Sequence, residues 1–335
     1  MRSGRTFFVL LTVLSFALLS GQPALAAAGT LDCRFGNNFG LASAMPSGVS
    51  GFQGGKAIAM YAGGTYADQL VMAGMSGNYP AQNGIVARFT ADGLLDTTFN
   101  TTGFSAVFDS GGDDIFMAVA AQDDGKIMVA GQAKATGDTY NKILVARYTS
   151  DGALDTSFSG DGWLTEAIGS SDSFWYDVVT DASGNIFVAG RSTVNPVGSW
   201  NHLATIVKYN SSGVRQAIWT YDLGTGVGNG NEGFYQIVPA GSGRFYAAGF
   251  SYNGTWDQNA IVYINSDGTL NTAFDGDGKK TFILSGVGSE YLYALGLQSD
   301  GKIVAAGTAD TDSNPIAYTW TSFTVRLNAD GTFDT

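Results

Sequence analysis

Residues 122–131 read QDDGKIMVAG, and residues 298–307 nearly repeat them as QSDGKIVAAG. In both stretches an Asp-Gly pair precedes an apolar run that ends in Ala-Gly. Asp-Gly between apolar runs is typical of a tight β-hairpin turn, since glycine readily adopts the positive φ that such a turn needs. The run 127–130 is apolar at every position, as in a strand that is covered on both faces. These stretches therefore predict hairpins within buried antiparallel sheets.

The Ala-Gly ending recurs along the chain at a near-constant interval. Its five closing glycines are evenly spaced: Gly74, Gly131, Gly190, Gly249 and Gly307. A second set of glycines closes a turn in step with the first: Gly93, Gly152, Gly213, Gly268 and Gly331. Self-similarity at such a fixed period indicates a repeat architecture.

Each repeat holds four strand-like segments, which in the second repeat lie near 103–109, 115–121, 126–132 and 142–149. Small four-stranded sheets covered on both faces indicate blades packed around an axis. A β-helix would need a shorter repeat, and a sandwich would show alternating strands. We therefore predict an all-β fold, a β-propeller with five blades of four antiparallel strands. The repeats would span roughly 29–93, 94–152, 153–213, 214–268 and 269–335.

The repeats also share the motif Leu-Asp-x-x-Phe after the second turn, as at 95–99 and 154–158. With the Asp-Gly hairpin and Val-Ala-Arg-Tyr, as at 145–148, this pattern resembles the delta-60 repeat of exported bacterial proteins. The resemblance covers nearly all of 29–335 and is weakest in the third repeat, at 214–216. It implies a propeller-like fold and export, and it carries over no active-site residue. Either a closed five-bladed ring or part of a longer array fits the pattern.

The segment 1–26 has the pattern of a secretory signal peptide. Arg2 and Arg5 precede an apolar stretch at 7–19, and Ala-Leu-Ala at 24–26 resembles a cleavage site. We expect the rest of the chain, 27–335, to be the propeller and to be extracytoplasmic. Removal of this segment takes away two arginines and no acid, so the formal charge would change from -12 to -14. Such acidity argues against a nucleic-acid partner, and no second apolar stretch predicts membrane insertion.

Few residues are suited to metal or thiol chemistry. His202 and Cys33 are the only histidine and cysteine, which excludes zinc sites with several histidines and any internal disulfide. Asp275–Gly278 and Asp310–Asn314 resemble the start of a calcium loop. The first lacks a third ligand and the second has Pro315 in place of glycine, so both are interpreted as turns. We expect no cofactor, with calcium at these loops as the remaining candidate.

A column of acidic residues precedes the Ala-Gly glycines at a near-constant spacing: Asp114, Asp172, Glu232 and Glu290. In one interpretation these carboxylates surround the channel mouth, where they would bind a cation or cleave a glycosidic bond. In the other, each accepts backbone hydrogen bonds within its own turn. We favour the second interpretation.

Aromatic residues lie at the far ends of the hairpins that follow the Ala-Gly pairs: Tyr79, Tyr140, Trp200, Trp256 and Trp320. Aromatic rings beside carboxylates would suit a sugar or peptide site. The alternative is that these rings simply pack over the hairpin ends.

The sequence as a whole predicts a non-catalytic, extracytoplasmic binding or scaffold module. It would recognise a glycan, a peptide or a surface protein through the face that carries Asp114, Asp172, Glu232, Glu290, Tyr140, Trp200, Trp256 and Trp320. The alternative is a glycan hydrolase that uses two of the carboxylates. Hydrolysis would require two carboxyl groups about 5–10 Å apart in a roomy central pocket. Carboxylates bound within their own loops would favour binding alone.

Overall fold

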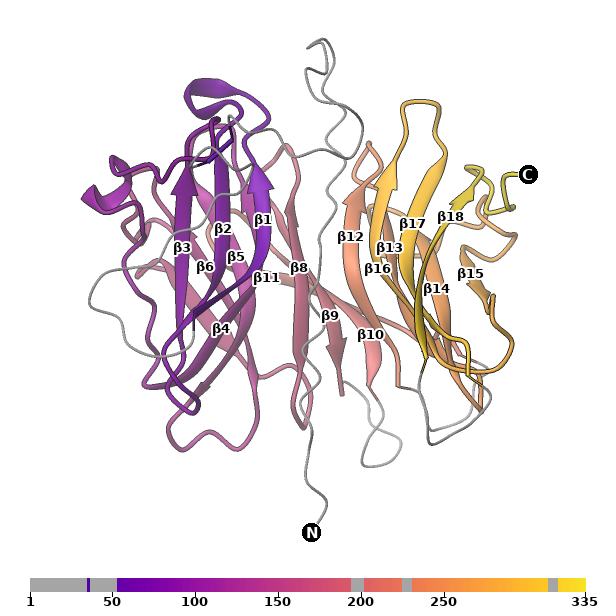
Figure 1. Ribbon diagram of the computed structural model, residues 1–335. Coiled ribbons are helices and arrows are strands. Elements are labelled where there is room, and N and C mark those ends of the chain that lie inside the picture. Colours follow the sequence, from indigo (N-terminus) through magenta and orange to yellow (C-terminus); the bar gives the residue numbers. More distant parts are fainter. Residues whose placement is uncertain (1–34, 37–52, 194–201, 225–230, 313–318) are drawn as a thin grey trace.

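Five small antiparallel sheets follow one another along the chain (Figure 1). The computed structural model describes residues 35–36, 53–193, 202–224, 231–312 and 319–335. The predicted signal peptide and Cys33 lie outside these ranges. The sheets are arranged as the five blades of a β-propeller, which confirms the predicted all-β fold. Figure 1 shows blades 1 and 2 at the left and blades 4 and 5 at the right.

The strand bounds show three or four strands in each blade. Blade 1 contains β1 (Gln53–Met60), β2 (Leu70–Ser76) and β3 (Asn83–Phe89), and blade 2 contains β4 (Gly112–Ala121), β5 (Ile127–Ala135), β6 (Lys142–Tyr148) and β7 (Trp163–Glu166). Blade 3 contains β8 (Phe174–Thr180), β9 (Ile186–Ser192), β10 (Leu203–Tyr209) and β11 (Arg215–Tyr221), and blade 4 contains β12 (Gly233–Pro239), β13 (Phe245–Tyr252), β14 (Asp257–Ile264) and β15 (Lys279–Phe282). Blade 5 contains β16 (Glu290–Leu297), β17 (Ile303–Asp310) and β18 (Trp320–Leu327). Two short 3-10 helices, η1 (Gly64–Tyr66) and η2 (Phe99–Thr101), lie in connections.

Apolar side chains fill the interfaces between consecutive blades. One buried cluster lies at each of the four junctions from blade 1 to blade 5. In β6, every residue from Ile143 to Tyr148 is buried, as expected for a strand covered on both faces. Each fully buried Val or Ile in these clusters contributes about 1.5–3 kcal/mol. Packing between blades therefore holds the fold together.

The glycine of each Ala-Gly pair is required by a β-bulge in the neighbouring strand. The first strand of every blade has a register shift opposite the pair, as between Phe116 and Ala118 opposite Gly131. A Cβ atom on Gly131 would overlap the carbonyl oxygen of Ile115. The same overlap with a first-strand carbonyl would occur at Gly74, Gly190, Gly249 and Gly307. The repeat marker thus reflects one close backbone approach, repeated five times.

The Leu-Asp-x-x-Phe motif joins each blade to the next. The Phe99 ring lies against Gly152 of the following blade, whose φ is 90°, and the backbone N–H of Asn100 donates to the carbonyl of Asp151 over 2.9 Å. Phe35 and Gly36 make the same pair of contacts with Gly93 and Asp92 of blade 1. At the third junction, where the motif is lost, Trp219 takes the place of the phenylalanine and lies against Gly268.

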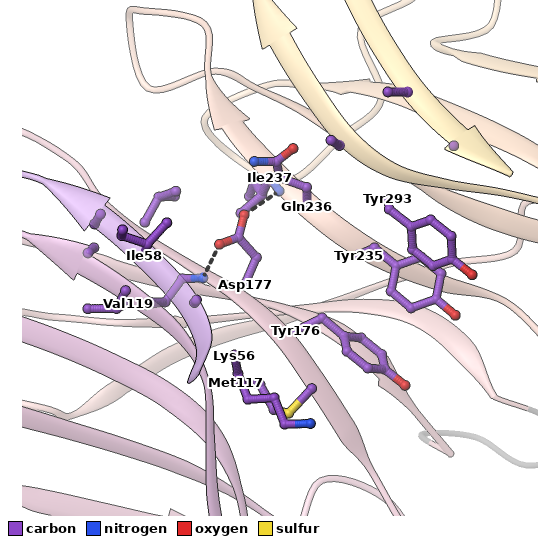
Figure 2. Close-up of a pocket in the computed structure, with 18 of the residues that line it drawn as sticks. Lys56, Ile58, Met117, Val119, Tyr176, Asp177, Tyr235, Gln236, Ile237 and Tyr293 are labelled. Carbon is purple, nitrogen blue, oxygen red and sulfur yellow. Dashed lines mark hydrogen bonds between the residues drawn. The ribbon is translucent and has the colours of Figure 1, made fainter. Parts of the chain in front are cut away.

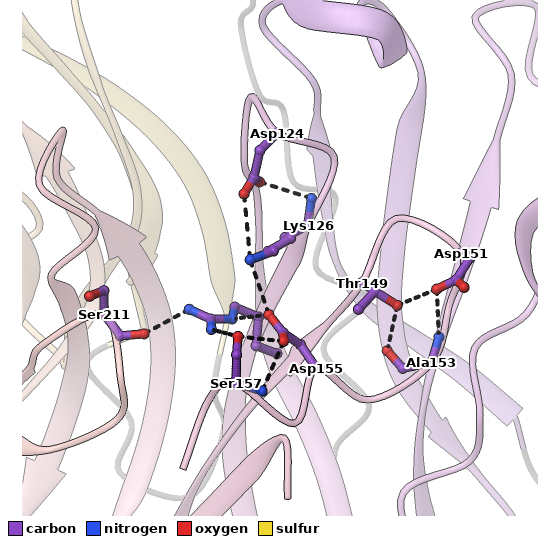
Figure 3. A network of polar contacts seen from close by, with 9 residues as sticks. Asp124, Lys126, Thr149, Asp151, Ala153, Asp155, Ser157 and Ser211 are labelled. Atoms are coloured by element: carbon purple, nitrogen blue, oxygen red, sulfur yellow. Dashed lines mark hydrogen bonds and ion pairs between the residues drawn. The ribbon is translucent and has the colours of Figure 1, made fainter. Parts of the chain in front are cut away.

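An arginine in the third strand reinforces two of these junctions. Arg147 forms a 2.7 Å ion pair with Asp155 and donates a 2.7 Å hydrogen bond to the Ser211 carbonyl of the next blade. Figure 3 shows the contacts around Asp155 and Ser211. Arg88 repeats the arrangement with Asp96 and the Ser150 carbonyl. In blade 5, Arg326 pairs with Asp334, but its side chain is half exposed.

The boundaries of the blades differ from those of the sequence repeat. Residues 103–109 were expected to form the first strand of the second blade. Instead Phe104 and Phe108 form bridges to Ala87 and Gly84, at the outer edge of blade 1. The chain therefore leaves the outside of one blade and begins the next blade at its innermost strand.

Consecutive blades pack on each other from blade 1 to blade 5, but in the described part of the chain blade 5 does not pack on blade 1 in the same way. Strand β1 packs on β4, β4 on β8, β8 on β12 and β12 on β16. In the part of the chain that the structure describes, β16 and β18 form no comparable packing with β1. Accordingly Ser322, Thr324 and Arg326 on β18 are exposed. Within the same ranges, no helix is long and apolar enough to cross a membrane.

Candidate functional site

The first strands of the five blades surround a central cavity of about 690 Å³ (Figure 2). Residues of β1, β4, β8, β12 and β16 line it, together with parts of β17 and β18 in blade 5. Because blade 5 does not pack on β1 among the described residues, the cavity extends from the axis along the free face of that blade.

The bulge in each first strand turns one extra side chain toward this cavity. In blades 3, 4 and 5 that residue is a tyrosine: Tyr176, Tyr235 and Tyr293. The ring centroids of Tyr176 and Tyr235 are 4.8 Å apart, and those of Tyr235 and Tyr293 are also 4.8 Å apart. We call these three residues the tyrosine wall. Figure 2 shows them side by side, with their hydroxyl groups pointing the same way.

Blades 1 and 2 place different residues at the same bulge position, Lys56 and Met117. The cavity is therefore asymmetric, with three aromatic rings on consecutive blades followed by a thioether and an ammonium group. A phenol is protonated at neutral pH and can donate hydrogen bonds, and burial raises the pKa of all three phenols of the tyrosine wall further above the usual value of about 10.

Two polar side chains behind the bulges hold the tyrosine wall in place. The Asp177 carboxylate accepts hydrogen bonds from the backbone N–H groups of Val178 and Ile237, both at 2.9 Å. Gln236 repeats this contact one blade further on, where its Oε1 accepts from the backbone N–H of Leu295. Burial raises the pKa of Asp177 to about 7. These hydrogen bonds join blades 3, 4 and 5 directly beside the three tyrosines.

Blade 5 provides a wall rich in hydroxyl groups. Thr308, Ser322 and Thr324 line the cavity. At the position of Thr324, counted from the third-strand Arg, Lys or Tyr, the other four blades have a fully buried aliphatic residue: Val86, Val145, Ile206 and Ile261. Blade 5 therefore departs from the repeat where its face borders the cavity.

The four predicted carboxylates lie at the start of the first strands or just before them, and each accepts hydrogen bonds there. Asp114 accepts hydrogen bonds from the backbone N–H and the hydroxyl of Ser110, at 2.6 and 2.7 Å. Glu232 accepts from the backbone N–H of Leu223, and Glu290 from those of Leu284 and Ser285. Asp172 accepts from the backbone N–H of Asn141 in the preceding blade. None of the four is among the described residues that line the cavity.

Burial is the largest influence on the pKa of two of these carboxyl groups, Asp114 and Glu232. It raises the pKa of Asp114, and it raises the pKa of Glu232 to about 7. Groups that are buried and bonded to their own loop are organised to hold the loop rather than to contact a ligand.

The predicted hairpin aromatics lie in different environments. Tyr140 and Trp320 are each 45% exposed, Tyr79 is 78% exposed, and Trp256 is half-buried. Trp200 lies outside the described residues. The Trp320 ring is 5.8 Å from that of Tyr291, which in turn contacts Tyr293 of the tyrosine wall at 6.2 Å. Trp320 thus extends the aromatic surface from the cavity toward the hairpin end of blade 5.

The predicted calcium loops show the contacts of turns. The Asp277 carboxylate accepts a hydrogen bond from the backbone N–H of Lys279, and Asp275 pairs with Lys280. Asp310 accepts from the backbone N–H of Asp312, but residues 313–314 lie outside the described ranges. Among the described residues, no group of three or more His, Cys, Asp or Glu side chains is placed to hold a metal ion.

The tyrosine wall was missed by the sequence interpretation, although a pattern for it exists. Tyr176, Tyr235 and Tyr293 each precede the glycine of their Ala-Gly pair at the same spacing. Met117 keeps this spacing, whereas Lys56 lies further ahead of Gly74 because the hairpin of blade 1 is longer.

Three stretches of the chain, residues 69–99, 122–158 and 298–335, match the family model described as "Domain of unknown function (DUF5122) beta-propeller". These three stretches are similar to repeats of a β-propeller family. These stretches contain the Ala-Gly pairs of blades 1, 2 and 5 and their Arg-Asp pairs. The more specific delta-60 name stays a prediction. No curated protein matches the sequence.

Several solved structures are similar in fold. A protein of unknown function from Bacteroides caccae is 10% identical, with 87% of this chain and 82% of that chain covered and a TM-score of 0.43. A protein of unknown function from Dyadobacter fermentans is 12% identical, with 80% and 75% covered and a TM-score of 0.47. An endo-arabinase from Bacteroides thetaiotaomicron is 13% identical, with 79% and 92% covered and a TM-score of 0.38.

Proposed function

We propose that this protein is a non-catalytic, extracytoplasmic binding module that holds a glycan in its central cavity. The observation that carries the proposal is the tyrosine wall, three half-buried rings from consecutive blades that face one cavity. Ring faces suit the C–H face of a sugar, and phenol hydroxyls suit its rim of hydroxyl groups. The extracytoplasmic location rests on the predicted signal peptide.

The part of the lining that β17 and β18 of blade 5 provide has complementary chemistry. Thr308, Ser322 and Thr324 offer hydroxyl groups that can both donate and accept hydrogen bonds. A mostly apolar cavity with a few polar groups is typical of small-molecule sites. A sugar chain, which has apolar faces and polar edges, matches this lining better than a wholly apolar ligand.

The arrangement of carboxylates supports binding over hydrolysis. Glycoside cleavage generally uses two carboxyl groups on either side of the scissile bond. Among the described residues that line the cavity, Asp177 is the one carboxylate. Both of its oxygens already accept backbone hydrogen bonds. Asp177 is therefore better suited to position the strands than to exchange protons with a substrate.

Isothermal titration calorimetry of the purified protein against a panel of oligosaccharides tests the proposal. We expect binding that Tyr235→Ala weakens by at least about tenfold, a loss of about 1.4 kcal/mol, because its ring is the centre of the tyrosine wall. Tyr140→Ala, at an exposed hairpin end, is the matched control and should bind like the wild type.

Two results would contradict the proposal. One is binding that depends on Tyr140 and not on Tyr235. The other is release of reducing ends from a bound glycan, since that would show hydrolysis.

A further inference from the structure

Lys56 gives the cavity a positive charge beside the tyrosine wall. It is the bulge residue of β1, so it occupies the position that Tyr176, Tyr235 and Tyr293 occupy in their blades. Among the described residues that line the cavity, it is the one basic side chain. Figure 2 shows Lys56 next to Met117, on the blades that continue the bulge series past Tyr176.

The Lys56 ammonium group differs from most lysines of the chain in its contacts. Lys126, Lys142, Lys280 and Lys302 each pair with a carboxylate. Within the described ranges, Lys56 makes no hydrogen bond or ion pair. A half-buried cation with no protein partner, in a cavity that otherwise suits a sugar, is available for an anionic group of a ligand.

The acidic groups near the cavity do not cancel this charge. Asp177 directs both oxygens at backbone N–H groups, and its burial favours the neutral carboxyl. The chain as a whole carries a net charge of -12. Charges on the outer surface are screened beyond about 8 Å at physiological ionic strength. Arg191 also places positive charge beside Tyr176 and Tyr235, but it is not among the described residues that line the cavity, where Lys56 is the one cation.

We infer that the cavity selects an anionic glycan, with the Lys56 ammonium group binding a carboxylate or sulfate while the tyrosine wall contacts the sugar rings. This inference rests on the proposed function. It adds the class of ligand and assigns a specificity-determining role to a residue of blade 1.

The test compares oligomers that differ in charge. Oligogalacturonate carries carboxylates, its methyl ester has the same backbone without the charge, and a sulfated oligosaccharide carries the other anion. We expect isothermal titration calorimetry at pH 7 to show at least tenfold tighter binding of one or both anionic oligomers than of the ester. The preferred anion distinguishes a uronate from a sulfate ligand.

Lys56→Met should abolish this preference, so that the acid and its methyl ester bind with equal affinity. Lys134→Met, a half-buried lysine outside the cavity lining, is the matched control and should keep the preference. Thermal melting would verify that both variants fold.

The outcomes separate the inference from the proposed function. Equal binding of acid and ester by the wild type, or a preference that survives Lys56→Met, overturns the inference and leaves the glycan-binding module standing. Binding of another oligosaccharide of the panel but of none of these three overturns the inference alone, and failure to bind any oligosaccharide overturns both.

Discussion

At the residue scale, two carboxyl groups at blade junctions have pKa values that move in opposite directions. Burial alone would raise the pKa of Asp155, but hydrogen bonds from Ser157 and the charge of Arg147 outweigh it and lower the pKa to about 2. Asp177 is bonded to backbone N–H groups without a cation, and its burial raises the pKa to about 7. The Ser157 hydrogen bonds together with the Arg147 charge therefore favour the ionised form of Asp155, whereas the backbone hydrogen bonds of Asp177 do not outweigh its burial.

These shifts predict an acidic optimum of stability. The pKa values of Asp177 and Glu232 rise to about 7, so the folded chain binds more protons than the unfolded chain between about pH 4 and pH 7. Stability must fall as the pH rises through this window. The lowered pKa of Asp155 acts the other way, because its stabilisation is lost as the pH falls from about 4 to 2. Melting temperatures measured by calorimetry should peak near about pH 4–5 and decline toward pH 8.

The Asp177→Ala variant should show a shallower decline between about pH 5 and pH 8 than the wild type, since one of the titrating groups is gone. Asp123→Ala serves as the control because this side chain is exposed in a hairpin turn. A decline as steep in Asp177→Ala as in the wild type would show that this carboxyl group does not couple to folding.

At the scale of the strands, the β-bulge and the glycine opposite it act as one unit. The bulge brings a first-strand carbonyl against the second strand, and only a residue without a Cβ atom fits there. The same bulge directs Lys56, Met117, Tyr176, Tyr235 and Tyr293 toward the cavity. The feature that defines the repeat in the sequence therefore also creates the candidate site.

Two glycines of blade 5 test this requirement in the same sheet. Gly307→Ala would force a Cβ atom onto the Tyr291 carbonyl oxygen, and we expect it to lower the free energy of unfolding by about 2–4 kcal/mol. Gly296 on β16 is exposed, and no atom lies within 4 Å of the place that a Cβ atom would take there. Gly296→Ala should therefore leave the free energy within about 1 kcal/mol of the wild type, in the stabilising direction. Urea denaturation measures both, and equal midpoints would refute the steric explanation.

The propeller could be predicted from the sequence because its markers are local. The Asp-Gly turns, the Ala-Gly pairs and the Leu-Asp-x-x-Phe motif make their contacts within one blade or with the next blade, so their spacing counts the blades. Residues 103–109 were assigned to the wrong blade because a sequence repeat does not show at which strand each blade begins. The five-blade count is unaffected by that choice.

The candidate site could be predicted only in part. Trp320 contacts Tyr291 beside the tyrosine wall, although it is not among the described residues that line the cavity. Asp114, Glu232 and Glu290 accept backbone hydrogen bonds from their own loops, as one interpretation expected, whereas Asp172 accepts from the preceding blade. The tyrosine wall was not recognised because a bulge interrupts the regular alternation of a strand. The bulge decides whether the Tyr235 side chain faces a neighbouring blade or the central cavity. The period of a regular strand does not reveal where such a bulge lies.

At the scale of the whole molecule, one junction between blades differs from the other four. Clusters of buried apolar residues fill the junctions from blade 1 to blade 5, whereas in the described part of the chain blade 5 turns hydroxyl groups toward the cavity. Thr324 stands where the other blades have Val or Ile. The free face of blade 5 is thus chemically matched to water or a polar ligand.

Reciprocal substitutions at one repeat position test this difference. Val145→Thr buries a hydroxyl group in the junction between blades 2 and 3, and we expect it to lower the free energy of unfolding by about 1–3 kcal/mol. Thr324→Val changes an exposed residue and should alter the free energy by less than about 0.5 kcal/mol. Urea denaturation measures both. Stabilisation by Thr324→Val of more than about 1 kcal/mol would instead show that this face is covered in solution.

The side of the cavity that blade 5 leaves unpacked has a consequence for long ligands. A pore closed on all sides must be threaded from a free end. In the described part of the chain, β1 and β18 flank the cavity without packing on each other, an arrangement that would allow a long glycan to enter from the side. Affinity per site would then be the same for an internal stretch as for a terminus. The length of the polymer would set only how many copies of the protein it carries.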